Sequence, residues 1–445
     1  MQTEFNFFQH WYPLSPIEDL DPEIPVPVTL LGIGLVIWKP RYSENYQVFL
    51  DVCPHRLAPL SEGRVDEKTG NLMCSYHGWQ FDAQGICTHI PQAENQQIIA
   101  KNQQNFCVTS LPVRQENDLL WVWPDVQTAE LADTTPLPLS PQIDAEKGFV
   151  WSYYVRDLEY DWQTLVENVA DPSHVPFAHH GVQGNRNKAI PIVMEIVQST
   201  INLIEIFYFS NGNNLVKINF EPPCRLEYLV SIGDTEKKLG LILYCLPVSP
   251  GKSRIVVQYS RNFAKTIHRL TPRWWNHLKI WNFTFDGDMI LLNQQEHLLQ
   301  QKQSSESWKT AYKLPTSADR SVIEFRNWFD KYCHGKLPWS EAGIKDSNNS
   351  LINNNHASLL DRYKQHTQHC SSCRQALKNI QRLQILLLTY FVVTVSGVAI
   401  LPDELRIKVG LPLVITALLG MGIYAWLKLL LIPQFYFVDY IHAKK

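Results

Sequence analysis

Two cysteine–histidine pairs lie close together near the beginning of the chain. Cys53 and His55 form the first pair, and Cys74 and His77 form the second. Thiolates and imidazoles are the ligands of an iron–sulfur cluster in which two histidines replace two cysteines on one iron. A Cys2His2 set also binds zinc, but zinc fingers usually keep the cysteines in one pair and the histidines in the other. Because each pair here mixes both types, the pattern favours two matching loops around a binuclear iron–sulfur cluster.

A second group of ligand types lies in the segment 168–180. On a straight helix, at roughly 100° per residue, His174 and His179 would lie about 140° apart and would not share a face. Pro172 and Pro176 interrupt the helix, which allows the two imidazoles to converge. Two histidines and a carboxylate are the ligands of mononuclear non-haem Fe(II) oxygenases, which keep open positions for O2. An isolated histidine pair is more often a surface feature than a metal site, so this interpretation depends on the presence of the iron–sulfur pattern in the same chain.

A third candidate is the Cys-x-x-Cys pair formed by Cys370 and Cys373. A disulfide across two intervening residues closes a short ring and exchanges readily, so the pair is typical of a redox-active dithiol. A small metal site that also uses His366 and His369 is a second interpretation. Two ordinary thiols are the third, and the residues alone leave all three open.

Composition limits the kind of protein that carries these residues. With 445 residues, the chain is long enough for two or three domains. Its net charge of −3 gives no basic footprint, so we expect no nucleic-acid partner. The nine cysteines lack the spacing of a secreted disulfide framework, and residues 1–11 show no secretory signal. Of the 14 Trp, 18 Tyr and 19 Phe residues, most should pack in the core and a minority could line a pocket for a large, flat substrate.

Hydrophobic periodicity indicates the elements that must position these residues. Short apolar runs separated by proline-rich turns predict an all-β domain over residues 5–135, which carries both cysteine–histidine pairs. Strand-like runs mixed with segregated helices over 140–340 predict an α+β domain with an antiparallel sheet. An Asn- and Ser-rich stretch predicts a linker over 341–380, which contains the Cys-x-x-Cys segment.

The C-terminal part predicts two transmembrane helices over residues 383–433. Residues 385–401 and 409–427 are apolar runs without a charge. At a rise of 1.5 Å per residue they are about 26 and 29 Å long, close to the roughly 30 Å of a bilayer core. Basic residues flank the hairpin and its loop balances acids with bases, so the positive-inside rule places the rest of the chain on the cytoplasmic side. A buried hairpin of a soluble protein is the alternative, and the apolar character of every face argues against it.

The sequences Cys-Pro-His-Arg and Cys-Ser-Tyr-His-Gly-Trp-Gln-Phe around the two pairs resemble the Rieske [2Fe–2S] domain of ring-hydroxylating oxygenases. The resemblance implies that Cys53 and Cys74 bind one iron of the cluster and that His55 and His77 bind the other. Two neutral imidazoles in place of two thiolates leave less negative charge on the cluster and raise its reduction potential. The chain would therefore relay electrons from a low-potential donor.

The sequence Asn-x-x-Asp-x-x-His-x-x-x-x-His that ends at His179 resembles the iron-binding segment of the same oxygenases. The resemblance implies that His174 and His179 bind a mononuclear Fe(II), with His180 as an alternative to His179. The third ligand in that family is an aspartate followed closely by a Gln-rich segment. We expect Asp288 to take this role in preference to Asp286.

Two further polar residues of this segment, Asn168 and Asp171, are expected to assist catalysis. A carboxylate three residues before a liganding histidine can accept the proton of its second ring nitrogen. In the resembled family this aspartate bridges neighbouring subunits, so Asp171 would connect His77 of one chain to His174 of the next. An ordinary aspartate at a helix end, before Pro172, is the alternative. The path between subunits is also the reason for expecting a homotrimer.

A Rieske oxygenase with a helix-grip α+β domain, a Cys-x-x-Cys segment and a C-terminal membrane hairpin resembles the pheophorbide a oxygenase-like branch of plants and cyanobacteria. The resemblance implies a ferredoxin-dependent monooxygenase that inserts oxygen from O2 into a chlorophyll-derived tetrapyrrole. Its soluble domains would lie on the cytoplasmic or stromal face of a thylakoid or inner membrane. A sterol-like or other lipophilic ring is the alternative substrate. A redox-sensing membrane interaction protein that uses Cys370 and Cys373 is an alternative of another class, and the complete set of iron ligands argues against it.

Overall fold

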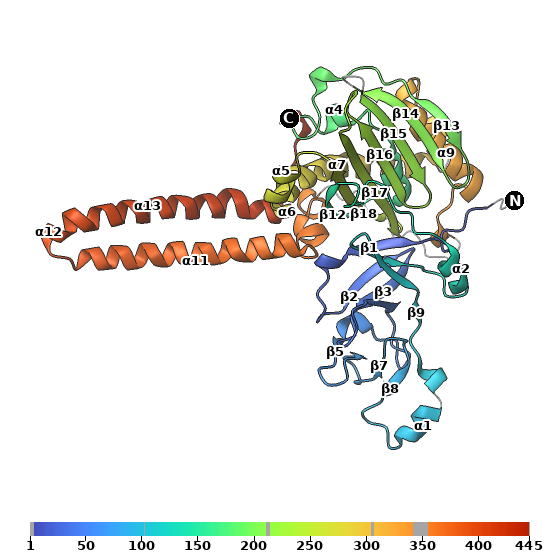
Figure 1. The fold of residues 1–445 in the computed structure, drawn as a ribbon, viewed down its shortest axis with the longest axis horizontal. Helices are drawn as coiled ribbons and strands as arrows, with labels where there is room; N and C mark the ends of the chain where they lie inside the picture. Colours follow the sequence, from blue (N-terminus) through green and yellow to red (C-terminus); the bar gives the residue numbers. More distant parts are fainter. Residues whose placement is uncertain (1–3, 102, 211–213, 304–306, 341–354, 445) are drawn as a thin grey trace. The chain divides into compact units, whose positions relative to one another are not determined.

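The computed structural model describes residues 4–101, 103–210, 214–303, 307–340 and 355–444 (Figure 1). The chain divides into two compact units, Met1–Leu270 with Asp288–Ile352, and Thr271–Gly287 with Asn353–Lys445. The first unit contains the cysteine–histidine pairs and the 168–180 segment, and the second contains the Cys-x-x-Cys pair and the C-terminal hairpin. The Asn- and Ser-rich part of the predicted linker, 341–354, lies outside the described residues.

The N-terminal part of the first unit is a β domain built from three antiparallel sheets (Figure 1). In spatial order, the first sheet contains β1 (Tyr12–Pro16), β11 (Leu119–Val122) and β10 (Val113–Glu116). The second sheet contains β2 (Val26–Leu30), β3 (Ile33–Trp38), β4 (Gln47–Leu50) and β9 (Ser110–Leu111). The third sheet contains β5 (Arg64–Val65), β6 (Leu72–Met73), β7 (Gln80–Phe81) and β8 (Cys87–His89). Because β1 pairs with β11, the beginning and the end of this domain are joined. The predicted all-β character is confirmed.

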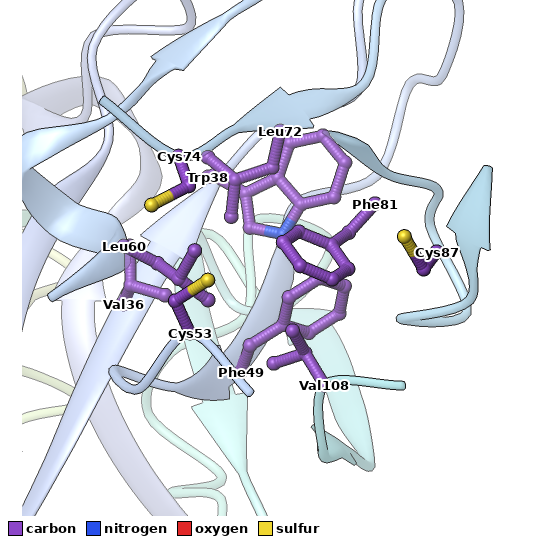
Figure 2. Close-up of a cluster of buried hydrophobic side chains, with 10 residues drawn as sticks. All are labelled: Val36, Trp38, Phe49, Cys53, Leu60, Leu72, Cys74, Phe81, Cys87 and Val108. Atoms are coloured by element: carbon purple, nitrogen blue, oxygen red, sulfur yellow. The ribbon is translucent and has the colours of Figure 1, made fainter. Parts of the chain in front are cut away.

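The core of the β domain includes both cysteines of the cysteine–histidine loops. Cys53 is 1% exposed and Cys74 is 2% exposed. They pack with Val36, Trp38, Phe49, Leu60, Leu72, Phe81, Cys87 and Val108 (Figure 2). Strand β3 supplies two of these side chains, and its last four residues are all buried, as expected for an apolar run covered on both faces. The two loops are thus fixed to a close-packed core by their cysteines.

The larger part of the first unit is built on a seven-stranded antiparallel sheet. In spatial order its strands are β12 (Val150–Leu158), β18 (Lys252–Arg261), β17 (Lys238–Ser249), β16 (Arg225–Ser231), β15 (Asn214–Glu221), β14 (Ile204–Ser210) and β13 (Glu195–Ser199). From β13 to β18, strands that follow each other in the sequence are neighbours in the sheet, so short connections suffice. In the first five residues of β14, every second side chain is buried, which indicates that one face of the sheet is covered.

Helices segregated from the strands supply this cover and confirm the predicted α+β class. Helix α3 (Trp162–Ala170) packs against β17 and also against α9 (Arg320–Cys333). Eight of the nine residues of α3 are buried, because the helix is enclosed on several sides. The carboxylate of Asp161 accepts a hydrogen bond from the first amide of α3 and so helps to begin the helix.

The second unit contains the predicted hairpin, formed by α11 (Ser371–Ala399) and α13 (Leu411–Trp426), which run side by side (Figure 1). Within the described part of the chain, Ser371–Ala399 and Asp403–Phe435 are helical stretches long and apolar enough to span a membrane. Only 6% and 22% of their most apolar windows are buried within the protein. Core helices of a soluble hairpin would be mostly buried, so the exposed apolar faces fit a membrane environment.

A buried ion pair joins α3 to α9 and gives a first test of this fold. The guanidinium of Arg326 donates to the carboxylate of Glu167 (Nε to Oε2, 2.6 Å) and to the side-chain oxygen of Gln163 (3.2 Å). We expect Arg326→Met to lower the free energy of unfolding by about 3–5 kcal/mol, because the buried Glu167 carboxylate loses its cationic partner. The midpoint of urea unfolding of the detergent-solubilised chain measures the change.

A matched control is the half-exposed pair of Lys217 and Glu205, whose charged atoms are 2.9 Å apart. We expect Lys217→Met to change the free energy of unfolding by about 1 kcal/mol or less, because exposed ion pairs contribute little. An Arg326→Met variant that is no less stable than this control would contradict the structural role of the buried pair.

Candidate active site

The two cysteine–histidine loops have the same backbone hydrogen bonds. In the first loop, the amide of Leu57 donates to the carbonyl of Cys53 (2.9 Å), and the amide of Cys53 donates to the carbonyl of Ala58 (2.8 Å). In the second loop, residues at the same offsets repeat both bonds at 2.9 Å: Gly78 to Cys74, and Cys74 to Trp79. The loops are therefore two matching fingers, as the mixed pairs predict.

The residue four positions after each cysteine has a left-handed backbone. Leu57 has a φ of 60° and Gly78 has a φ of 71°. Glycine adopts this conformation at little cost, whereas a leucine rarely does. The first finger therefore holds a strained residue at the position where the second finger uses glycine, and the shared hydrogen bonds fix both in the same shape.

The cysteines and the histidines of the two fingers differ in their exposure to solvent. The thiols of Cys53 and Cys74 contact each other within the core, whereas His55 is exposed and His77 is partly exposed. The two imidazole rings have their centres 4.4 Å apart, and the ring of His55 stacks on Trp79 at 4.5 Å. The structure thus brings together the four predicted cluster ligands, with sulfur inside and nitrogen toward the surface. This donor set fits a [2Fe–2S] cluster with two thiolates on one iron and two imidazoles on the other.

Protonation of the buried thiols also bears on cluster binding. Burial raises the pKa of Cys53 to about 11, and the neighbouring Cys74 adds to the rise. Iron binds thiolates, so loading of the cluster must displace protons from this site.

The second predicted centre consists of His174, His179 and Asp288, whose candidate ligand atoms all lie within 4.8 Å of one another. The Nε2 atoms of the two histidines are 3.2 Å apart. The Asp288 carboxylate lies 3.4 Å from Nε2 of His179 and 3.9 Å from Nε2 of His174. Ligand atoms about 2.1 Å from one ion and at right angles would be roughly 3.0 Å apart. The three side chains therefore fit one face of a six-coordinate ion and leave the opposite positions open.

A break in the helix positions the two histidines. Helix α3 ends at Ala170, and a single turn, α4 (Val175–Ala178), follows after Pro172. His174 and His179 lie at the two ends of this turn. The predicted interruption thus brings together imidazoles that a straight helix would have separated.

Helix α7 (Asn282–Gln303) carries both candidate aspartates, and their partners distinguish them. The carboxylate of Asp286 accepts hydrogen bonds from Nε and Nη2 of Arg362 (2.8 and 2.6 Å), and both side chains are fully buried. Asp288 instead lies beside the two histidines. His180, the predicted alternative to His179, accepts the backbone amide of Arg186 at Nδ1 (3.2 Å). This geometry favours Asp288 and His179 as ligands.

Three hydrogen bonds set the position of α7 relative to the segment around α3. They connect Asn293 to the carbonyl of Glu159 (2.6 Å), Glu296 to the amide of Asp161 (2.6 Å), and Gln295 to the carboxylate of Glu167 (3.2 Å). These residues lie one or two turns beyond Asp288 on the same helix. They therefore hold the carboxylate near histidines that are more than a hundred residues away in the sequence.

Asp171 lies behind His174, on the side away from the centre. Its Oδ2 is 3.7 Å from Nδ1 of His174, and its Oδ1 accepts the amide of Ser173 (2.7 Å). Burial disfavours both charges, but the attraction between them prevails, so the pKa of Asp171 is lowered and that of His174 is raised. The pair is arranged so that the carboxylate orients the imidazole.

A cavity of about 470 Å3 adjoins this centre. Asp171, His174 and Asp288 line it, as does the predicted residue Asn168 at the end of α3. Its other lining residues, which the sequence did not single out, are Glu167, Ala178, Leu291, Leu292, Gln295, Ala311, Tyr312, Lys313, Leu314, Asp319 and Val322. Leu291 and Leu292 follow Asp288 by three and four residues, so helical spacing was a usable signal for them. No comparable local signal marks the 311–322 segment.

The Cys-x-x-Cys pair is buried in the second unit. Cys370 is 2% exposed and Cys373 is fully buried, and both lie beside His366. His369, the other predicted partner, is exposed and contacts the side chain of Gln368. The fourth side chain of the cluster is His277, which the sequence analysis did not identify.

Comparisons with known proteins agree with this geometry. The chain matches the family described as pheophorbide a oxygenase over residues 220–306 and the Rieske [2Fe–2S] domain over residues 10–111. It is 37% identical to a chloroplastic pheophorbide a oxygenase of Oryza sativa subsp. japonica, over 99% of this chain and 86% of the relative. It is 32% identical to a chloroplastic flavonoid 8-hydroxylase 2 of Ocimum basilicum, over 99% of this chain and 87% of the relative.

A solved structure supports the same fold. Dicamba monooxygenase bound to dicamba aligns with a TM-score of 0.60 and 19% identity, over 76% of this chain and 99% of that chain. Family membership rests on the full-length relatives, and it agrees with the two matching fingers and the second centre. The chain belongs to the pheophorbide a oxygenase family of Rieske non-haem iron oxygenases, enzymes with a [2Fe–2S] cluster and a mononuclear iron.

Proposed function

We propose that this chain is a membrane-anchored oxygenase that inserts oxygen from O2 into a chlorophyll-derived tetrapyrrole, with electrons from ferredoxin. The observation that carries the proposal is the convergence of His174, His179 and Asp288 beside a cavity. When bound, the cluster supplies single electrons and the mononuclear iron supplies O2 activation. The chain's own residues bind these groups, position the substrate and limit the access of water.

In this proposal the buried thiols of Cys53 and Cys74 hold the inner iron of the cluster. The imidazoles of His55 and His77 hold the outer iron, near the surface at which a neighbouring subunit could dock. Asp171 orients His174 and, in a homotrimer, connects it to His77 of the adjacent subunit. The Asp171 carboxylate faces Nδ1 of His174 at 3.7 Å, and this proximity supports the role, since a carboxylate that orients a liganding imidazole also helps to position the iron.

The substrate is assigned by chemistry and by relatives. Leucine and valine side chains in the cavity lining suit an apolar ring, and polar residues of the same lining could orient its substituents. The pheophorbide a oxygenase of rice supports a tetrapyrrole. The flavonoid 8-hydroxylase among the relatives favours, as a second candidate, a different flat and lipophilic ring.

The exposed apolar faces of α11 and α13 support anchoring in a membrane, where a lipophilic substrate also partitions. Basic residues flank the hairpin, and we place the soluble domains on the cytoplasmic or stromal face on that basis. Ferredoxin is the proposed donor, because a cluster with raised potential accepts electrons readily from a low-potential iron–sulfur protein.

Ligand substitutions should empty the two centres independently. We expect wild-type protein to contain about three iron and two sulfide per chain. Cys74→Ser should lose the sulfide and about two iron, whereas His179→Ala should keep the cluster and lose about one iron. Metal analysis and electron paramagnetic resonance of the dithionite-reduced protein measure both. His180→Ala is the control and should keep all iron. Loss of the mononuclear iron in that variant would identify His180, in place of His179, as the ligand.

Substitution of Asp171 should separate electron transfer from metal binding. We expect Asp171→Asn to retain cluster and iron but to lower turnover by roughly 10- to 100-fold, because His174 loses its orienting charge. Single-turnover kinetics with a pre-reduced cluster measure the rate of cluster oxidation. Ser173→Ala keeps the amide that binds Asp171 and should behave like wild type. Wild-type rates in Asp171→Asn would reject the bridging role.

Reconstitution tests the substrate and the donor. Anaerobically purified protein in detergent, supplied with reduced ferredoxin and 18O2, should convert a chlorophyll-derived tetrapyrrole into a product that contains 18O. Mass spectrometry detects the product, and His179→Ala is the inactive control. Incorporation of 18O into a flavonoid, with no incorporation into a tetrapyrrole, would favour the second candidate. Full metal loading without any labelled product would contradict both substrate classes.

A further inference from the structure

Four side chains of types that can bind a metal meet inside the second unit. They are His277, His366, Cys370 and Cys373, and each is 2% exposed or less. They come from three local segments: the helical turn His277–Trp281, the turn Tyr363–Thr367, and the start of α11. Chain segments far apart in the sequence therefore place two thiols and two imidazoles around one point.

Four distances among the ligand atoms are close to those around a tetrahedral ion and slightly shorter. Nδ1 of His277 lies 3.1 Å from Nε2 of His366, 3.6 Å from Sγ of Cys370 and 3.4 Å from Sγ of Cys373. Nε2 of His366 lies 3.3 Å from Sγ of Cys373. A zinc ion bonded to sulfur at about 2.3 Å and to nitrogen at about 2.0–2.1 Å places its ligand atoms roughly 3.3 to 3.8 Å apart. A slight expansion of the observed cluster would accommodate the ion.

The charge of the four groups suits the same ion. Two thiolates and two neutral imidazoles carry a charge of −2, which a divalent cation neutralises. The surrounding shell is apolar and includes Leu278, Leu377, Ile380, Leu427 and Phe435. A neutral centre is favourable in such a shell, whereas unpaired thiolates would be costly. Nη2 of Arg273 lies 3.3 Å from Sγ of Cys370 and can donate to a sulfur that remains electron-rich after metal binding.

The backbone at the beginning of α11 positions both sulfurs beside the two imidazoles. Cys370 caps the beginning of α11, and Cys373 lies in its first turn. The amide of Cys370 also donates to the carbonyl of His366 (3.1 Å), which closes the turn between His366 and the two cysteines. A helix N-terminus favours negative charge, so both cysteines are held where thiolates are stabilised.

We propose that His277, His366, Cys370 and Cys373 bind a structural Zn2+ ion at the base of the hairpin. An S2N2 tetrahedral set is typical of zinc, and four protein ligands leave no position for substrate. The burial of both cysteines also argues against a dithiol that exchanges with an external partner. The site accounts for the Cys-x-x-Cys pair without assigning it a redox role.

Metal analysis of the full-length, detergent-solubilised and iron-loaded protein tests the proposal. We expect about one zinc per chain in wild type and near zero in His277→Ala and in Cys370→Ser/Cys373→Ser. The Rieske signal and the iron content should stay at wild-type levels, so zinc loss is scored separately from oxygenase activity. His369→Ala is the matched control, because this exposed neighbour lies outside the cluster, and it should retain zinc.

A second set of measurements uses wild-type protein, so it tests the proposal even if the ligand variants do not fold. Titration of native wild-type protein with a mercurial reagent should release one zinc as the two thiols react, and protein produced with Co2+ should show the intense visible bands of a tetrahedral site with thiolate ligands. Absence of zinc from wild type, its retention in the ligand variants, its loss from His369→Ala, or a Cys370–Cys373 disulfide in the native protein would each overturn the proposal. A fourth iron in place of zinc would overturn it as well.

Discussion

The burial of the Asp288 carboxylate against two imidazoles is the interaction on which the architecture of the first unit depends. A carboxylate that is almost removed from water needs polar or charged partners, and Asp288 keeps the two imidazoles within reach only while α7 holds its position. The hydrogen bonds from α7 to the segment around α3, and the ion pair from α3 to α9, resist such movement. Helices α3 and α9 also pack against the seven-stranded sheet.

The two fingers solve a different problem, which is to hold a cofactor that is half buried and half accessible. Their cysteines belong to a close-packed core, so the thiol end is rigid and dry. Their histidines lie toward the solvent, where electrons can enter or leave. Repetition of the same hydrogen bonds in both fingers explains how a strained Leu57 and an unstrained Gly78 reach the same shape.

Local patterns predicted the fingers, the broken helix and the apolar hairpin, because each depends on residues close together in the sequence. The choice of Asp288 as the candidate third iron ligand needed a family resemblance, since α7 carries two aspartates and the partner that distinguishes Asp286 is Arg362, 76 positions further on. His277 was missed for the same reason, because it lies 89 positions before His366. The choice of His369 as a companion of the thiols followed proximity in the chain, whereas the turn at 368–369 leaves that imidazole exposed to solvent.

The proposed anchoring of the hairpin in a membrane has a kinetic consequence. A tethered enzyme and a reactant dissolved in the same bilayer meet by diffusion within a thin layer and not throughout the aqueous volume. Confinement raises their effective concentration without any new contact in the binding cavity. A cavity of modest size and mixed polarity could thus work on dilute, sparingly soluble molecules, since the lipid phase collects them first.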